Sequence, residues 1–242
     1  MTPFSLNAID FQWLPILPLI TIAIAAIVVL LVGVRVPDDG SDGLGWLAIA
    51  SLAIAFVFTL AMSGQNTTAF AGSIAIDDFA VFFELAILFV AAVIVLMSLN
   101  YADEIRLPGA EYYSLILFAA LGMMLMAAAG DLIIIFLGLE TMSIAIYVLA
   151  GLKRTDPRSG EAAIKYFLLG AFSTGFLLYG IALVYGAVGT IKLEPIRSAL
   201  DHGVVAALRG LDAKNRHISW LYHAPLSKTR WFLFPSPVYR AD

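Results

Sequence analysis

Long apolar runs separated by short polar segments dominate the chain. Each of six runs is long enough to cross a hydrocarbon core of about 30 Å as a helix that rises about 1.5 Å per residue. The segments between them carry turn formers, as in Pro37–Gly43. The pattern therefore predicts an all-α fold, a polytopic bundle of six transmembrane helices at residues 13–34, 44–63, 79–99, 112–129, 131–151 and 162–188.

The same pattern divides the chain into four parts. Residues 1–12 are predicted to form an N-terminal external segment, residues 13–190 the six-helix transmembrane bundle, and residues 191–208 a loop. Residues 209–242 form a polar, basic tail in which Lys and Arg interrupt every apolar window, so no span is predicted there. The alternative for this tail is an amphipathic segment on the membrane surface.

Composition supports a membrane protein and excludes several other classes. Hydrophobic residues make up 61% of the chain and charged residues 13%, far from the balance of a soluble domain. There is no cysteine, and the three histidines lie beyond the spans, so we expect no metal site and no redox centre. The net charge of −4, without a basic stripe, gives no sign of a nucleic-acid partner.

Basic residues gather in alternate loops. The first, third and fifth loops hold Arg35, Arg106 and the cluster at residues 153–158, whereas the second and fourth hold no Lys or Arg. Short cytoplasmic loops collect such residues, so the N-terminus is predicted to lie outside. Lys192 and Arg197, after the sixth span, would lie outside in this orientation, which disagrees mildly with the rule.

A carboxylate in the fifth span is the best candidate for chemistry. Glu140 lies near the middle of this span, where a charge costs about 2.5–3.5 kcal/mol on insertion scales and marks a functional interior. Lys165, in the sixth span, has the opposite sign, so the two residues are candidates for a proton relay. A supporting polar face is predicted from Ser143 and Tyr147 on the fifth span and from Ser173 and Thr174 on the sixth.

The charged residues of the spans also have structural interpretations. Lys165 has a stem long enough to reach the cytoplasmic interface, or it pairs with Glu161 one turn earlier. Glu84, near the start of the third span, is likewise expected to reach the outer interface. Asp131 suits the N-cap of the fifth span. For Glu140 the alternative is a hydrogen-bonded structural acid.

The residues from Phe136 to Ile191 resemble the N-type antiporter-like subunit of the proton-pumping NADH:quinone oxidoreductase, respiratory complex I. The shared pattern is FLGLE, then SGEA, IKYF and GFLLYG, followed by YGAVGT. The resemblance implies a subunit of the bacterial inner membrane that lies in the lipid bilayer among other membrane-arm subunits and takes part in proton translocation coupled to quinone reduction. It places Glu140 and Lys165 at the family's proton-carrying glutamate and sixth-span lysine.

The resemblance also implies that the chain has no cofactor of its own, because NADH, FMN, iron–sulfur clusters and quinone bind to other subunits. Family members are about twice as long, with two inverted halves. The chain lacks the seventh span and its lysine, so a truncation or a frameshift after about residue 208 is expected. The alternatives are a fragment of an Mrp-type cation/proton antiporter, and a scaffold or pseudogene remnant without pumping activity.

Overall fold

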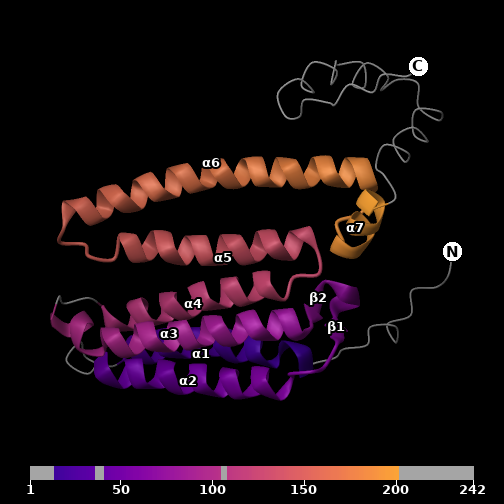
Figure 1. Ribbon diagram of the computed structural model, residues 1–242. Helices are drawn as coiled ribbons and strands as arrows, with labels where there is room; N and C mark the ends of the chain where they lie inside the picture. Colours follow the sequence, from indigo (N-terminus) through magenta and orange to yellow (C-terminus); the bar gives the residue numbers. More distant parts are fainter. Residues whose placement is uncertain (1–13, 36–40, 105–107, 202–242) are drawn as a thin grey trace, which may run out of the picture. The chain divides into compact units, whose positions relative to one another are not determined.

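The computed structural model describes residues 14–35, 41–104 and 108–201. It divides into a compact unit that ends at Glu194 and a second unit that begins at Pro195. The predicted N-terminal segment 1–12 and the basic tail 209–242 lie outside the described residues. The first unit is a helix bundle, and it contains every predicted span (Figure 1).

The main helices follow the apolar runs closely. They are α1 (Leu17–Gly33), α2 (Ser41–Ala61), α3 (Asp78–Glu104), α4 (Gly109–Ala127), α5 (Leu132–Ala150) and α6 (Pro157–Val188). In the described part, α2 to α6 are long and apolar enough to cross a membrane. α1 has 17 residues and is preceded by a 3-10 turn, η2 (Leu14–Ile16), so the first predicted span is the shortest helix of the bundle. The all-α transmembrane prediction is confirmed.

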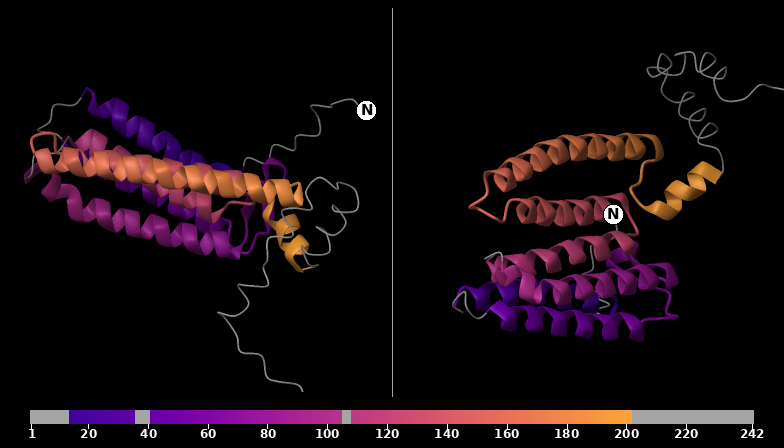
Figure 2. Two further views of the ribbon diagram at one scale, coloured as in Figure 1. Left: turned by 90° about the horizontal axis from the view of Figure 1, so that it is seen from above. Right: turned by 60° about the vertical axis from the view of Figure 1, so that its left-hand side comes forward.

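The buried core lies among α1, α2, α3 and α4. Apolar side chains from each of them are almost fully shielded, such as Ile22, Leu52, Leu88 and Leu117. α5 packs on α4, and α6 packs on α5, so these two helices extend the bundle on one side (Figures 1 and 2). Most large apolar side chains of α6 are exposed, which suits contact with lipid or with other protein.

Glycines allow α4 and α5 to cross at backbone contact. A Cβ atom added at Gly122 would lie 2.5 Å from the carbonyl oxygen of Gly138, and one added at Gly138 would lie 2.7 Å from the carbonyl oxygen of Gly122. No real Cβ atom approaches a backbone oxygen so closely, so both positions require glycine at this separation of the helices. Small residues commonly permit such close crossings in membranes.

A short antiparallel hairpin caps one end of the bundle, where the sequence predicted only a loop. Strand β1 (Thr67–Ala69) pairs with β2 (Ile74–Ile76) around the 3-10 turn η4 (Phe70–Gly72). The turn between α4 and α5 joins this hairpin: the amide of Ala75 donates to Ala128, and that of Gly130 donates to Ser73, both at 2.8 Å. The strands form because backbone groups beyond the helix ends still need hydrogen-bond partners.

The break between the fourth and fifth spans is a tight turn, and not a kink in one long helix. The side chain of Asp131 accepts a hydrogen bond from the amide of Ile134 at 2.8 Å and thereby caps α5. Asp156 caps α6 in a similar way, through the amide of Arg158, and Pro157 occupies the first helical position. α6 therefore begins five residues before its predicted start at residue 162.

The segment 191–208 is not wholly a loop, because it contains helix α7 (Leu193–Asp201). Leu193, Ile196 and Leu200 recur at helical spacing in this segment, while charged residues occupy other positions, so the short helix is amphipathic. The run was too short and too polar to register as a span, which is why it was assigned to a loop.

Candidate functional site

Glu140 occupies the middle of α5, nine residues after its capping residue Asp131, or about 13 Å along the helix. Its Oε1 atom is buried and has no hydrogen-bond partner among the described residues. A buried carboxylate oxygen without a donor is costly in a purely structural role, because nothing offsets the loss of water. The oxygen is therefore suited to bind a proton or an ordered water.

The crossing of α4 and α5 fixes the position of this carboxyl group. Gly138 precedes Glu140 by two residues, and Met142 follows it by two. Both contact Gly122 of α4, since a Cβ atom added at Gly122 would lie 2.5 Å from the backbone nitrogen of Met142. The backbone on either side of Glu140 is thus held against the neighbouring helix.

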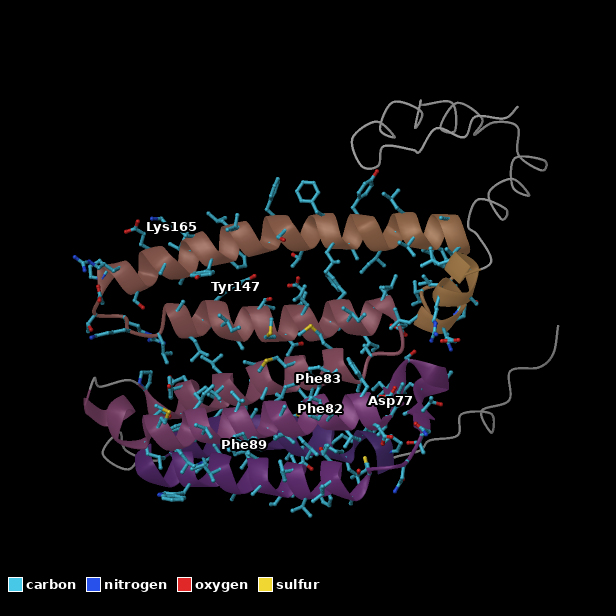
Figure 3. All side chains as sticks on the ribbon, viewed as in Figure 1. Asp77, Phe82, Phe83, Phe89, Tyr147 and Lys165 are labelled. Carbon is cyan, nitrogen blue, oxygen red and sulfur yellow. The ribbon has the colours of Figure 1, made fainter. Side chains whose placement is uncertain are left out.

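The predicted polar face of α5 runs from Glu140 toward α6. Ser143 is buried, and Tyr147 is half-buried. The hydroxyl end of Tyr147 lies directly over Gly170 of α6, where an added Cβ atom would be 1.8 Å from the Tyr147 oxygen. The Tyr147 ring also meets Phe167 edge-on, with centroids 6.3 Å apart. Tyr147 therefore lies at the contact between α5 and α6 (Figure 3).

The structure does not bring Lys165 to Glu140. Lys165 forms an ion pair with Glu161, one turn earlier on α6, and both side chains are largely exposed. This is the local pairing that the sequence allowed as the alternative. On the same helix Ser173 is exposed, and Thr174 is half-buried with its hydroxyl donating to the carbonyl of Ala171 at 3.2 Å. Among the described residues, no hydrogen bond or ion pair joins Lys165, Ser173 or Thr174 to the α5 members of the predicted polar face.

Glu84 does not reach the outer interface as expected from the sequence. Its side chain is 1% exposed, and its Oε2 atom accepts a hydrogen bond from the Thr59 hydroxyl of α2 at 3.4 Å. Its Oε1 atom, like that of Glu140, is buried without a partner in the described part of the chain. The expectation was wrong because it placed the residue by its distance from the helix end. The packing of α2 on α3 decides which way the side chain points.

The structure describes all of the predicted site residues. Asp131 is confirmed as an N-cap, and Glu140, Ser143 and Tyr147 follow one another along α5. Among the residues that the structure describes, no group of three or more His, Cys, Asp or Glu side chains is arranged to hold a metal ion.

Comparison with known proteins gives this helix bundle its class. Residues 129–211, which include α5 and α6, match the family described as NADH:quinone oxidoreductase/Mrp antiporter, transmembrane. The chain belongs to this family of polytopic membrane proteins.

Curated proteins similar to the chain include N subunits of NADH-quinone oxidoreductase. The chain is 45% identical over 183 residues to the subunit from Trichlorobacter lovleyi, a match that covers 76% of this chain and 38% of the relative. It is 42% identical over 193 residues to a subunit N from Rhizobium meliloti, covering 79% and 40%. The chain thus spans about two fifths of the length of these relatives.

Two solved structures show the same fold. One is respiratory complex I from Thermus thermophilus with bound aureothin, where a chain 33% identical to this one matches with a TM-score of 0.61 over 73% of this chain and 38% of its own length. The other is the membrane-bound sulfane sulfur reductase, an archaeal respiratory membrane complex, at 26% identity and a TM-score of 0.61 over 76% and 39%.

Proposed function

We propose that the chain is part of the membrane arm of a bacterial NADH:quinone oxidoreductase and takes part in proton translocation coupled to quinone reduction. Its relatives named subunit N and its likeness to a chain of respiratory complex I support this proposal. In this role the chain itself carries no redox cofactor. Its neighbours are other membrane-arm subunits, and the redox groups and the quinone bind elsewhere in the complex.

Glu140 is the proposed proton carrier, and its buried, unpartnered Oε1 atom is the observation that carries the proposal. A carboxyl group at this depth costs several kcal/mol when charged and alone, so it changes its charge state only when a partner or water comes near. Ser143 and Tyr147 extend polar groups from Glu140 along α5 to the contact with α6. Movement of water or of a neighbouring charge along this face would load and unload the carboxyl group.

Lys165 has a different place in the proposal. In the described residues its ammonium group is satisfied by Glu161, and both groups are exposed on a helix that has one buried residue, Ile181. Lys165 contributes to proton transfer only if another protein surface covers this face of α6 and separates it from Glu161. The proposal therefore rests on Glu140 alone, and Lys165 acts with it only when another protein surface covers this face of α6.

The proposed orientation places the N-terminus outside. Successive helices alternate in direction, so the loops with Arg35 and with Lys153, Arg154 and Arg158 lie at the end of the bundle opposite the hairpin. The accumulation of positive charge at that end supports its assignment to the cytoplasmic side. The third basic loop, with Arg106, lies outside the described residues.

The decisive experiment replaces Glu140 with Gln and compares it with Glu161→Gln, the same chemical change at an exposed carboxylate. Inverted membrane vesicles that contain the assembled complex are energised with NADH, and acidification of the lumen is followed with a pH-sensitive dye. We expect proton pumping to fall sharply in Glu140→Gln, while assembly persists, and to persist in Glu161→Gln. Unchanged pumping in Glu140→Gln would favour a scaffold role for the helices.

A cation/proton antiporter is the second candidate, because the matched family includes Mrp antiporters. This activity needs no electron transfer. Vesicles that contain the chain would then exchange Na⁺ for protons after an imposed sodium gradient, without NADH. Sodium-driven proton movement in the absence of NADH would support the antiporter, and pumping that depends on NADH would support the oxidoreductase.

A further inference from the structure

A second carboxyl group with a buried, unpartnered oxygen lies in the described part of the bundle, and nothing in the proposed relay uses it. Glu84 on α3 is 1% exposed, and Thr59 on α2 is fully buried beside it. The Thr59 hydroxyl donates to Glu84 Oε2 at 3.4 Å, which is a long hydrogen bond. Glu84 Oε1 is buried and has no partner in the described part of the chain.

The helices α2 and α4 and the strand β2, which pack on α3, give Glu84 no basic partner, and Lys192, a cation at the hairpin end, donates to the carbonyl of Ala71. Between Leu44 and Ala61, α2 has no ionisable residue, and the strand β2 has none. On α4 the ionisable residues are Glu111, Tyr112 and Tyr113, all near the start of that helix, whereas its other end lies by the hairpin. No described cation therefore faces Glu84 from the elements that pack on α3.

The acids nearest to Glu84 in sequence are engaged elsewhere. Asp77 accepts a hydrogen bond from the amide of Ala80 at 2.8 Å, and Asp78 accepts one from the amide of Gly64 at 3.2 Å. Both residues are exposed at the hairpin end of α3, where Figure 3 labels Asp77. They are negative when ionised, so they cannot neutralise a charge on Glu84.

The level of Glu84 along the bundle is apolar on the outside as well. Phe79, Phe82 and Phe83 on the same turns of α3 are 64%, 65% and 41% exposed, and such aromatic surfaces suit lipid tails rather than water. An ionised carboxylate at this level would have one weak donor and no counterion. Such a group is stable only as the neutral acid or when water or a cation enters.

We propose that Glu84 and Thr59 form a proton-binding site between α2 and α3, separate from the site at Glu140. The proton resides on Oε1, the oxygen without a partner, while Oε2 keeps its hydrogen bond from Thr59. Binding and release involve only the proton, which is exchanged with water that enters between the helices. The site does not depend on the function proposed for Glu140, because it rests on contacts of α2 and α3 alone.

Infrared spectroscopy of the purified chain in lipid nanodiscs tests the site. A protonated carboxyl group gives a C=O stretching band that is well separated from the carboxylate bands and shifts in D₂O. We expect such a band at neutral pH, lost in Glu84→Gln and retained in Glu161→Gln. In Thr59→Val, where Glu84 remains but its hydroxyl donor is absent, the band should move to higher frequency. Titration of the band with pH then reports binding and release.

Two results would overturn the proposal. One is a wild-type chain with no protonated carboxyl band at neutral pH, and the other is a band that is unchanged in both Glu84→Gln and Thr59→Val. The Thr59→Val shift keeps the test decisive if Glu84→Gln does not fold. The Glu140→Gln variant separates the two sites, because it leaves the Thr59-sensitive band in place whether or not it stops proton pumping.

Discussion

Replacing Gly122 with Ala should destabilise the bundle at the crossing of α4 and α5. The added Cβ atom would lie 2.5 Å from the Gly138 oxygen and from the Met142 nitrogen, whereas ordinary contacts begin at 3.4 Å. Both atoms belong to the backbone of α5, so neither can rotate away. The two helices must separate locally by about 1 Å, and overpacking of this kind typically costs about 1–3 kcal/mol.

Gly175→Ala is the matched control. Gly175 also lies in a long apolar helix, but a Cβ atom added there meets nothing within 4 Å. Alanine has the higher helix propensity, so this substitution should leave stability unchanged or raise it by up to about 1 kcal/mol. Both variants replace one glycine with alanine, but only Gly122→Ala disturbs a helix crossing.

The assay is reversible unfolding of the purified chain in mixed micelles, with helix content followed by circular dichroism as the fraction of denaturing detergent rises. Gly122→Ala should lower the midpoint clearly, and Gly175→Ala should not. Equal midpoints for Gly122→Ala and the wild type would refute the close crossing. Because Glu140 lies between the two contact residues of α5, a real separation should also reduce proton pumping in the assembled complex.

Three further substitutions test local contacts. Asp131→Ala removes the cap of α5 and should cost about 0.5–2 kcal/mol, while Asp131→Asn should cost less, as measured by the same unfolding assay. Gly170→Ala should be harmful through its clash with Tyr147, so its cost should shrink in a Tyr147→Ala background; additive costs would contradict that contact. Lys165→Ala removes an exposed ion pair with Glu161 and should change stability by less than about 0.5 kcal/mol, so a large loss would show a buried role for the lysine.

The apolar runs alone determined the class of fold and the approximate bounds of the spans. A segment of this length and composition has few options in lipid, because a helix satisfies all of its backbone hydrogen bonds internally. Local signals were equally dependable: Asp131 caps α5 as predicted, and the pair of Glu161 and Lys165 follows from their spacing of four residues. These features depend on neighbours along the chain, which the sequence shows directly.

Tertiary structure decided what the charged and polar side chains face. The hairpin at residues 67–76 forms hydrogen bonds with the turn between α4 and α5, and no local sequence pattern predicts that pairing. Glu84 and Lys165 lie at similar distances from the ends of their helices, yet Glu84 is enclosed beside Thr59 and Lys165 is exposed. The difference arises because α3 is packed between neighbours while α6 contacts mainly α5, and helix packing is a property of the whole bundle.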